Sequence, residues 1–287
     1  MTEEDLQQLR ARKWRLDGIG VKTIEQAREF IDEAGFCLMY PERSLPMAPS
    51  FMGAYAGSAT GVPDSKHAFA DPRSQPATEL MVRLLRERSA YEINLLPGAD
   101  LVISTALFPY LYSLLADDKP QAAPTVRAQG VRVSKLAIDI FDAIQKHGPA
   151  SRDRLRELAG RELSNAALDR ALGELWSILK ITRVDYREGE GALWDVFYRW
   201  SPGVIKQAVD ISEPESISAL LTKFLETTIA ATQEEIETFF AHLTSRSKLR
   251  DATNALLSAR ELDYITVGQK TLIRLAPVSE QRRRING

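Results

Sequence analysis

The chain has 287 residues, of which 44% are hydrophobic and 26% are charged. This composition is that of an ordinary globular protein and excludes a disordered or fibrous one. Its 37 basic and 39 acidic side chains give a net charge of −2. That balance excludes a protein coated in positive charge for sequence-independent nucleic-acid binding. Any contact with DNA would have to use a local basic patch.

Three features indicate a cytoplasmic protein without a membrane segment. The start, "MTEEDLQQLRARKW", is acidic and then polar, so no secretory signal is expected. Cys37 is the single cysteine, which fits a reducing compartment because no internal disulfide can form. The longest uncharged run, residues 101–116, is shorter than the ~18 residues of a membrane span and contains Pro109. We interpret this run as a buried strand followed by a helix.

Residues 1–120 differ from the rest in their sequence pattern and are expected to form a helical or mixed domain. A first helix is predicted at about 3–16. A second follows Thr23, where Gln26 completes a capping box and Gly35 supplies the C-terminal stop.

Residues 41–76 are predicted to be a long loop, because they hold six of the fourteen prolines. A connection of this length inside a domain is usually functional or mobile. A further helix is expected over 77–89, before the apolar run. The stretch 121–130 is rich in Pro, Ala and polar residues and indicates a linker to the remainder of the chain.

The remainder contains an internal repeat. At a constant offset of 81 residues, helix-face and N-cap positions of 131–209 fall on equivalent positions of 210–277 without a gap. Ten such matches in one register are more than helical amphipathicity alone supplies. The matching positions in the first unit are Leu136, Ile140, Ile144, Ser151, Leu155, Leu158, Ser164, Leu168, Ala171 and Leu175.

After each third helix the hydrophobic period changes from that of a helix to that of a strand. Two strands flank "EGEG" in the first unit and "GQ" in the second, which predicts a hairpin in each. In the first hairpin, Trp194, Val196, Tyr198 and Trp200 are expected to share one strand face. Helix, short helix, helix and hairpin is the order of a winged helix. The predicted fold is therefore mainly α with small β-hairpins (α+β): tandem winged-helix domains behind a helical N-terminal domain.

The third helix of the second unit offers the better surface for DNA. Its exposed positions are basic against a single Asp251, whereas the matching helix of the first unit is nearly neutral. Arg and Asn can read base edges bidentately, and a basic tail can bind phosphates. A solvated helix face is the alternative, and winged helices also serve as protein-interaction modules. The candidate DNA-binding residues are Arg246, Lys248, Arg250, Asn254, Lys270 on the second wing, Arg170, and the tail residues Arg282, Arg283 and Arg284.

Three stretches, "DEAGFCLMYPERS", "VRLLRERSAYEI…LVISTALFPYLYSLL" and "SKLAIDIFDAIQKHGPASRDRLRELAG", resemble the AlkZ/YcaQ-type winged-helix DNA glycosylases. The resemblance spans roughly residues 20–276. It implies a tandem winged-helix scaffold and an activity that excises alkylated or crosslinked bases.

The resemblance also implies a catalytic glutamine–apolar–glutamine (or aspartate) triplet near the end of an early helix and before a proline. In this sequence the triplet positions are Cys37, Leu38 and Met39, ahead of Pro41. None of these side chains positions or deprotonates a water well. The prediction is therefore a non-catalytic DNA-binding protein in repair or damage recognition. The alternatives are an active glycosylase with a polar group of the 41–76 loop in the triplet's place, and a protein-interaction module.

Other catalytic chemistry finds little support. His67, near Asp64 and Asp71 in "DSKHAFADPR", is the one histidine beside carboxylates, and such a group is usually a solvated turn. No P-loop, dinucleotide fingerprint, zinc-ligand spacing or GxSxG motif occurs. We expect no cofactor and no metal, with DNA as the partner.

Overall fold

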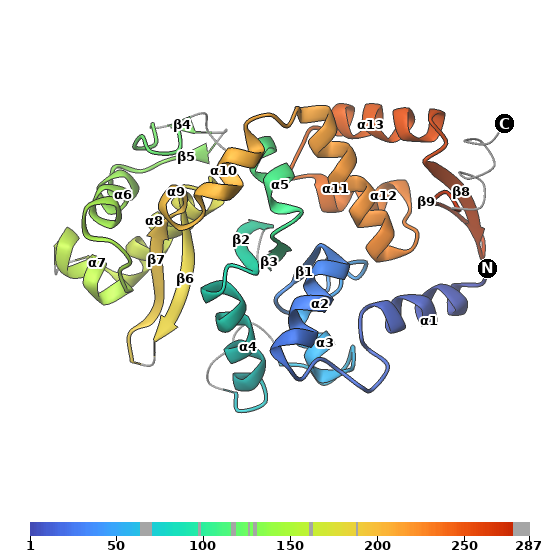
Figure 1. The fold of residues 1–287 in the computed structure, drawn as a ribbon, viewed down its shortest axis with the longest axis horizontal. Coiled ribbons are helices and arrows are strands. Elements are labelled where there is room, and N and C mark those ends of the chain that lie inside the picture. Colours follow the sequence, from blue (N-terminus) through green and yellow to red (C-terminus); the bar gives the residue numbers. More distant parts are fainter. Residues whose placement is uncertain are drawn as a thin grey trace.

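The computed structural model describes residues 1–63, 71–96, 99–115, 119–125, 127–128, 131–160, 163–187 and 189–277. The two repeats lie at opposite ends of an elongated molecule, with the N-terminal elements between them (Figure 1). Helices dominate, and the strands form small antiparallel groups. This confirms the predicted combination of helices and small hairpins. Within the described ranges, no helix is long and apolar enough to cross a membrane.

The N-terminal part is built on a small antiparallel sheet with the strand order β1-β3-β2. Ile103 in the middle strand pairs with Phe36 on one side and with Tyr91 on the other. The elements of this part are α1 (Glu3–Lys13), α2 (Ile24–Ala34), β1 (Phe36–Leu38), α3 (Phe51–Ala56), α4 (Gln75–Arg86), β2 (Ala90–Leu96), β3 (Ala99–Ser104) and α5 (Phe108–Leu115). The apolar run is thus a strand followed by a helix, as expected.

The predicted ends of the first two helices are partly confirmed. Thr23 and Gln26 form the expected capping box at the start of α2, and Gly35 ends that helix with a φ of 74°. The first helix is shorter than the predicted 3–16. It ends at Lys13 because Arg15 adopts a left-handed backbone conformation, with a φ of 57°.

The prediction that 41–76 is one long loop is wrong in its middle and at its end. Phe51 and Met52 are buried in α3, and the Ser50 hydroxyl caps this helix by accepting from the backbone N–H of Gly53 at 3.1 Å. The next helix, α4, begins at Gln75 rather than at residue 77. Asp64 and His67 lie outside the described residues.

Each repeat contains helices followed by an antiparallel hairpin, in the expected order. Ser151 and Thr232 cap the equivalent short helices, and Ser164 and Ser245 cap the equivalent third helices. The first repeat consists of α6 (Lys135–His147), α7 (Arg152–Ala159), α8 (Asn165–Ser177), β6 (Ile181–Arg187) and β7 (Gly191–Val196). The second consists of α11 (Glu213–Thr228), α12 (Gln233–Phe240), α13 (Arg246–Ser258), β8 (Leu262–Val267) and β9 (Lys270–Leu275).

A further equivalence between the repeats appears only in three dimensions. Ala150, before the short helix, forms an isolated antiparallel bridge with Trp194 on the first hairpin. Ala231, at the equivalent place, forms the same bridge with Ile273 on the second hairpin. Both repeats therefore close their hairpin onto the helical part in the same way.

One prediction about the segments around the first repeat is corrected. Tyr198 and Trp200 do not lie on the strand face of Trp194, because the strand ends at Val196 and is followed by α9 (Phe197–Trp200) and α10 (Pro202–Ala208). Pro202 starts α10, as suits the first turn of a helix. The predicted linker contains β4 (Arg127–Ala128), which pairs with β5 (Val131–Arg132).

The large hydrophobic core joins the N-terminal sheet to the second repeat. Phe36 of β1 packs against Phe224 of α11 and Phe239 of α12, with ring centroids 6.0 and 4.9 Å away. The first repeat has its own core, in which Trp176 and Trp194 meet edge to face at 5.1 Å. The two repeats are thus unequal in how they attach to the rest of the molecule.

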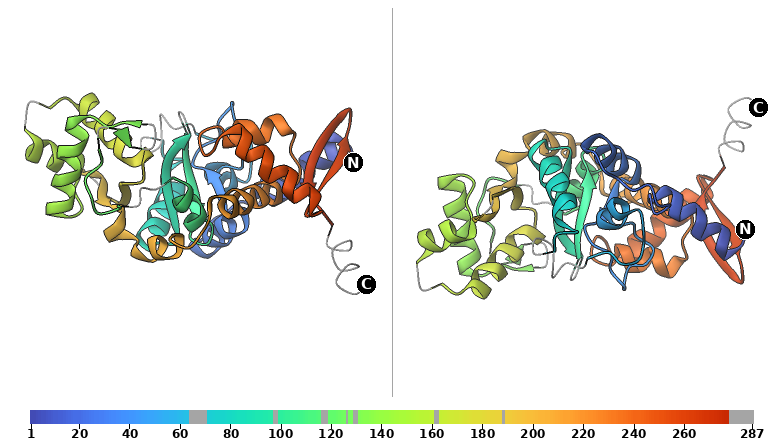
Figure 2. Two further views of the ribbon diagram at one scale, coloured as in Figure 1. Left: turned by 90° about the horizontal axis from the view of Figure 1, so that it is seen from above. Right: turned by 90° about the horizontal axis from the view of Figure 1, so that it is seen from below.

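Helix α1 lies beside the second hairpin, as two further views show (Figure 2). Leu6 packs against Val267 and Leu272 of that hairpin. The buried Arg10 donates from Nε to the carbonyl of Thr228 at 2.9 Å and from Nη2 to that of Ala230 at 2.7 Å. This helix therefore covers one face of the second hairpin.

Candidate nucleic-acid interface and cleft

The basic side chains predicted on the second repeat lie on α13 and are each paired with a carboxylate. Glu237 of α12 accepts from Arg246 at 2.9 Å and from Arg250 at 2.8 Å. Lys248 Nζ lies 2.6 Å from a carboxylate oxygen of Glu213. Hydrogen bonds from Arg250 and Gln233 hold the pKa of Glu237 below its usual range. The patch is therefore close to neutral, and DNA phosphates would have to compete with these carboxylates.

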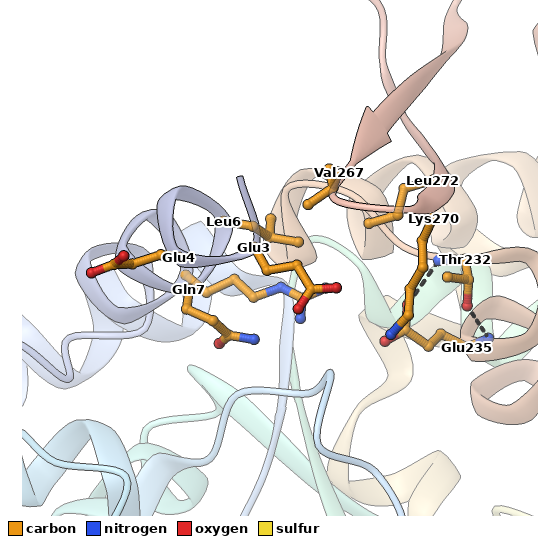
Figure 3. A pocket seen from close by; sticks show the side chains of 10 residues that line it. Glu3, Glu4, Leu6, Gln7, Thr232, Glu235, Val267, Lys270 and Leu272 are labelled. Atoms are coloured by element: carbon orange, nitrogen blue, oxygen red, sulfur yellow. Dashed lines mark hydrogen bonds between the residues drawn. The ribbon is translucent and has the colours of Figure 1, made fainter. Parts of the chain in front are cut away.

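The other predicted contact residues do not join this cluster. Lys270 begins β9 and lines a pocket of about 260 Å³ between α1 and the second hairpin, together with Glu3, Glu4 and Glu235 (Figure 3). Asn254 is exposed on α13, as expected, and Arg170 is exposed on α8 of the other repeat. The tail residues Arg282, Arg283 and Arg284 lie outside the described residues.

The triplet positions lie on and directly after β1, not at the end of a helix. Cys37 and Leu38 have no exposed surface, and Met39 is 4% exposed. Burial raises the pKa of the Cys37 thiol well above its usual range, so this group stays protonated and is a core residue. Met39 differs from its two neighbours because it lines a cleft.

The cleft lies between α4, the first hairpin and the N-terminal sheet, and has a volume of about 440 Å³. Ligand pockets commonly have this size. Strand alternation places Glu92 in it: Tyr91 and Ile93 point into the large core, and Glu92 between them points to the opposite face. The residues of interest in its lining are Met39, Tyr40, Glu92, Asp100, Arg183 and Trp194.

Arg183 of the first hairpin connects the two carboxylates of the sheet. Its Nη1 lies 2.9 Å from Glu92 Oε1 and 3.5 Å from Asp100 Oδ2. The guanidinium lies over the rings of Trp176, at 4.2 Å, and Trp194, at 5.2 Å. Trp176 also donates from Nε1 to the backbone carbonyl of Glu92 at 3.0 Å. These contacts fix the orientation of the charged groups in the cleft.

The environment shifts the pKa values of two groups in the cleft. Burial raises the pKa of Glu92 to about 6, and the charge of Asp100 adds to this, while Arg183 opposes it. Burial raises the pKa of Tyr40 to about 12, against a hydrogen bond to Thr78 that lowers it. At neutral pH Glu92 is therefore a carboxylate close to its pKa, and Tyr40 is a neutral phenol.

Several donors of the cleft have no protein partner. In the part of the chain that the structure describes, Nε of Arg183, Nε of Arg152 and Nε1 of Trp194 are buried and lack a hydrogen-bond acceptor. All three residues line the cleft. Buried donors in proteins are nearly always satisfied, so unpaired ones gathered around one cavity point to a bound water or ligand there.

A family model described as DNA glycosylase AlkZ-like matches residues 70–285. The chain belongs to the AlkZ-like DNA glycosylase family. The match includes Glu92, Asp100 and Arg183, and begins after Met39.

One solved structure has the same overall fold as this AlkZ-like chain. The Streptomyces sahachiroi DNA glycosylase AlkZ superposes with a TM-score of 0.57 at 15% sequence identity, covering 96% of this chain and 71% of that protein. A search of curated proteins found no match. The similarity in fold extends over nearly the whole of this chain.

Sequence reasoning missed the charged residues of this cleft. Glu92, Asp100 and Arg183 do not form a motif, because strands far apart in the chain bring them together. One signal was present: Glu92 is the single charge in "AYEINLL", a segment otherwise suited to a buried strand. Charged side chains are rarely buried without a partner or a function, so this residue could have been selected.

Proposed function

We propose that this chain is a DNA-repair protein that holds duplex DNA on tandem winged helices and receives one displaced nucleotide in the cleft. One observation carries the proposal. Met39, which the sequence resemblance assigns to the last position of the triplet, forms part of the wall of the cleft together with Glu92 and Asp100. The expected triplet thus borders a cavity with fixed charged groups, which supports the proposal. Family membership supports DNA as the partner.

The domain division follows from the same proposal. Residues 1–120 supply α4 and the sheet as two sides of the cleft, and the winged helix of 131–209 supplies the third side through its hairpin. The winged helix of 210–277 contributes α13 to the DNA-binding surface. When DNA binds, Arg246, Lys248 and Arg250 of this helix exchange their carboxylate partners for phosphates. The order of helices and hairpin in both repeats supports this assignment.

The cleft is large enough for a displaced base and is lined by the groups that such a base needs. Bases taken out of the duplex are held by stacking and by hydrogen bonds to their edges. Tyr40 and Tyr186 offer aromatic surface, and the unpaired donors of Arg183 and Trp194 offer hydrogen bonds.

Fluorescence anisotropy with three DNAs tests the proposal: an intact duplex, a duplex with an abasic-site analogue, and a single strand, each at two salt concentrations. We expect binding that weakens steeply with salt, since phosphate contacts release counterions. We also expect tighter binding of the duplex with the abasic-site analogue, whose opposite or neighbouring base is easily displaced. A folded protein that binds none of the three at low salt would contradict the proposal and indicate a protein partner.

A pair of variants separates the cleft from the duplex-binding surface. Val82 of α4 lines the cleft, so Val82→Trp should fill it and abolish the preference for the abasic-site duplex. Affinity for the intact duplex should remain. Arg83→Trp places the same side chain on the exposed side of α4 as the matched control and should keep the preference.

A further inference from the structure

We propose that Glu92 is the catalytic base of the cleft and activates the water that hydrolyses the N-glycosidic bond of the displaced nucleotide. This inference rests on the proposed function, since it needs a nucleotide in the cleft. Cys37, Leu38 and Met39 cannot perform the water-orienting role of the triplet. A carboxylate from another strand performs it instead. The prediction of a non-catalytic protein rested mainly on the loss of the triplet.

Burial distinguishes Glu92 from the other carboxylates of the cleft. Its side chain is 7% exposed, whereas that of Asp100 is 32% exposed and that of Asp169 is 51% exposed. Asp185 and Asp169 are each paired with an arginine at the rim, Arg86 and Arg152. Glu92 is thus the carboxylate whose interactions are least weakened by solvent.

The remaining buried carboxylate of the described residues has a structural role. Asp195 is 3% exposed, and it binds Arg199 of the following helix and the backbone N–H of Val196. It does not line the cleft. Glu92, in contrast, accepts a hydrogen bond from the side chain of Arg183 and faces a cavity. A buried acid with few donors beside open space is the arrangement of a proton acceptor.

Arg183 is a positioning residue in this scheme. Trp176 and Trp194 hold its guanidinium, and Nη1 fixes Oε1 of Glu92. The carboxylate faces the cleft, where it can accept a proton from water. Because Asp100 shares the same guanidinium, the group of Glu92, Asp100 and Arg183 carries a net negative charge, which stabilises positive charge developing on the sugar.

The reaction balances without any further reactant. The water oxygen bonds to C1′ of the sugar, and Glu92 takes a proton from that water. The bond between C1′ and the base nitrogen breaks, and its electron pair goes to the base. A base that was positively charged through alkylation leaves neutral, and the sugar keeps a hydroxyl at C1′. Glu92 then returns its proton to solvent.

The pH dependence follows from the groups that face Glu92. Arg183 approaches from β6, Asp100 from β3, and Tyr40 from the segment after β1. Helix α8 offers the indole of Trp176, and α4 lines this part of the cleft with Thr78, Met81 and Leu85. Among these groups Glu92 is the one whose pKa is raised to about 6, so activity should rise through about pH 6 and then level off.

The experiment is a single-turnover assay of the full chain with a duplex containing 7-methylguanine, in which the released base is measured. We expect release well above the spontaneous rate. Glu92→Gln should lower it by about 10²-fold or more, the usual contribution of a general base. Glu25→Gln, at an exposed position on α2, is the matched control and should release base like the wild type. The rise near pH 6 should disappear in Glu92→Gln.

Two further measurements keep the result interpretable. Glu92→Gln should bind the duplex with unchanged affinity, which shows that it is folded. Met39→Gln in the Glu92→Gln background should restore part of the release, because it returns a water-orienting amide to the cleft. Wild-type protein that binds the duplex yet releases no base, or equal release by Glu92→Gln, would overturn the inference and leave the DNA-binding proposal standing. Absence of DNA binding would instead overturn the proposed function.

Discussion

Arg183 on the first hairpin donates a hydrogen bond of 2.9 Å to Glu92 on the N-terminal sheet. This contact joins the first repeat to the N-terminal part of the chain. It also places the guanidinium over two indole rings and beside a second carboxylate, Asp100. The attachment of the first repeat and the chemistry of the cleft therefore depend on the same side chain.

Replacing either neighbour of Glu92 should move its pKa in a direction set by the sign of the removed charge. Asp100→Asn removes a negative charge and should lower the pKa of Glu92 from about 6. Arg183→Gln removes the positive partner and should raise it. Titration followed by ¹³C NMR of the Glu92 carboxyl measures both shifts. Asp185→Asn, a rim carboxylate paired with Arg86, is the control and should leave the value unchanged. Shifts of the same sign in the first two variants would contradict this arrangement.

The raised pKa of Glu92 also makes stability depend on pH. The folded state binds its proton more tightly than the unfolded state, whose pKa is near 4.5. The contribution of Glu92 to stability is therefore fully present below pH 4.5 and is lost as the pH rises through about 6. From pH 4 to pH 8, the free energy of unfolding of the wild type should fall by about 2 kcal/mol relative to Glu92→Gln, given about 1.4 kcal/mol per pKa unit. Urea unfolding of both proteins across this range measures the difference, and a constant difference would show that Glu92 titrates normally.

Glu237 limits the DNA affinity of the second repeat, because it engages both Arg246 and Arg250. Glu237→Gln should release the two guanidinium groups and strengthen duplex binding several-fold. It should also steepen the slope of log affinity against log salt concentration by about one to two, since each new phosphate contact releases about one counterion. Glu234→Gln removes the same charge from an exposed position of α12 that does not touch either arginine, and is the matched control. Anisotropy titrations at several salt concentrations distinguish the variants. Equal gains in both would indicate an effect of net charge alone.

The sequence predicted best those features that depend on neighbouring residues. The capping box of Thr23 and Gln26 and the N-caps Ser151 and Thr232 depend on contacts within one turn, so local spacing was sufficient to find them. The pairing of Arg246 with Glu237 was missed because the carboxylate lies on another helix. The same limit applies to the whole cleft, whose charged groups meet only after the sheet and the first hairpin pack together.

Helix α1 shows a further limit of local reasoning, since its sequence does not reveal that it binds the second repeat. Arg10 is buried there and donates to the carbonyls of Thr228 and Ala230. Arg10→Met should lower the free energy of unfolding by about 2–4 kcal/mol, because hydrogen bonds to a charged donor contribute about 1.5–3 kcal/mol each and the cost of burying the charge offsets part of this. Arg12→Met, at an exposed position of the same helix, should change it by less than about 0.5 kcal/mol. Chemical denaturation compares the two, and similar stabilities would mean that α1 is not held by Arg10.

The shared core predicts that the N-terminal sheet and the second repeat unfold together. Phe224 of α11 has no exposed surface and packs against Phe36 of β1, whereas Phe141 is equally buried in the separate core of the first repeat. Phe224→Ala and Phe141→Ala should each cost about 3–5 kcal/mol through loss of buried area and the cavity left behind.

The two variants should differ in which parts of the protein lose stability. Hydrogen exchange should accelerate in β1 and in the second hairpin of Phe224→Ala, because one continuous core supports both. In Phe141→Ala the acceleration should be confined to the first repeat, because Phe141 belongs to the separate core of that repeat. Acceleration in Phe224→Ala restricted to the second repeat would mean that each repeat is an independent folding unit. In that case the sheet would keep its stability without the packing of α11. The shape of the cleft would then depend on the first repeat and not on the second.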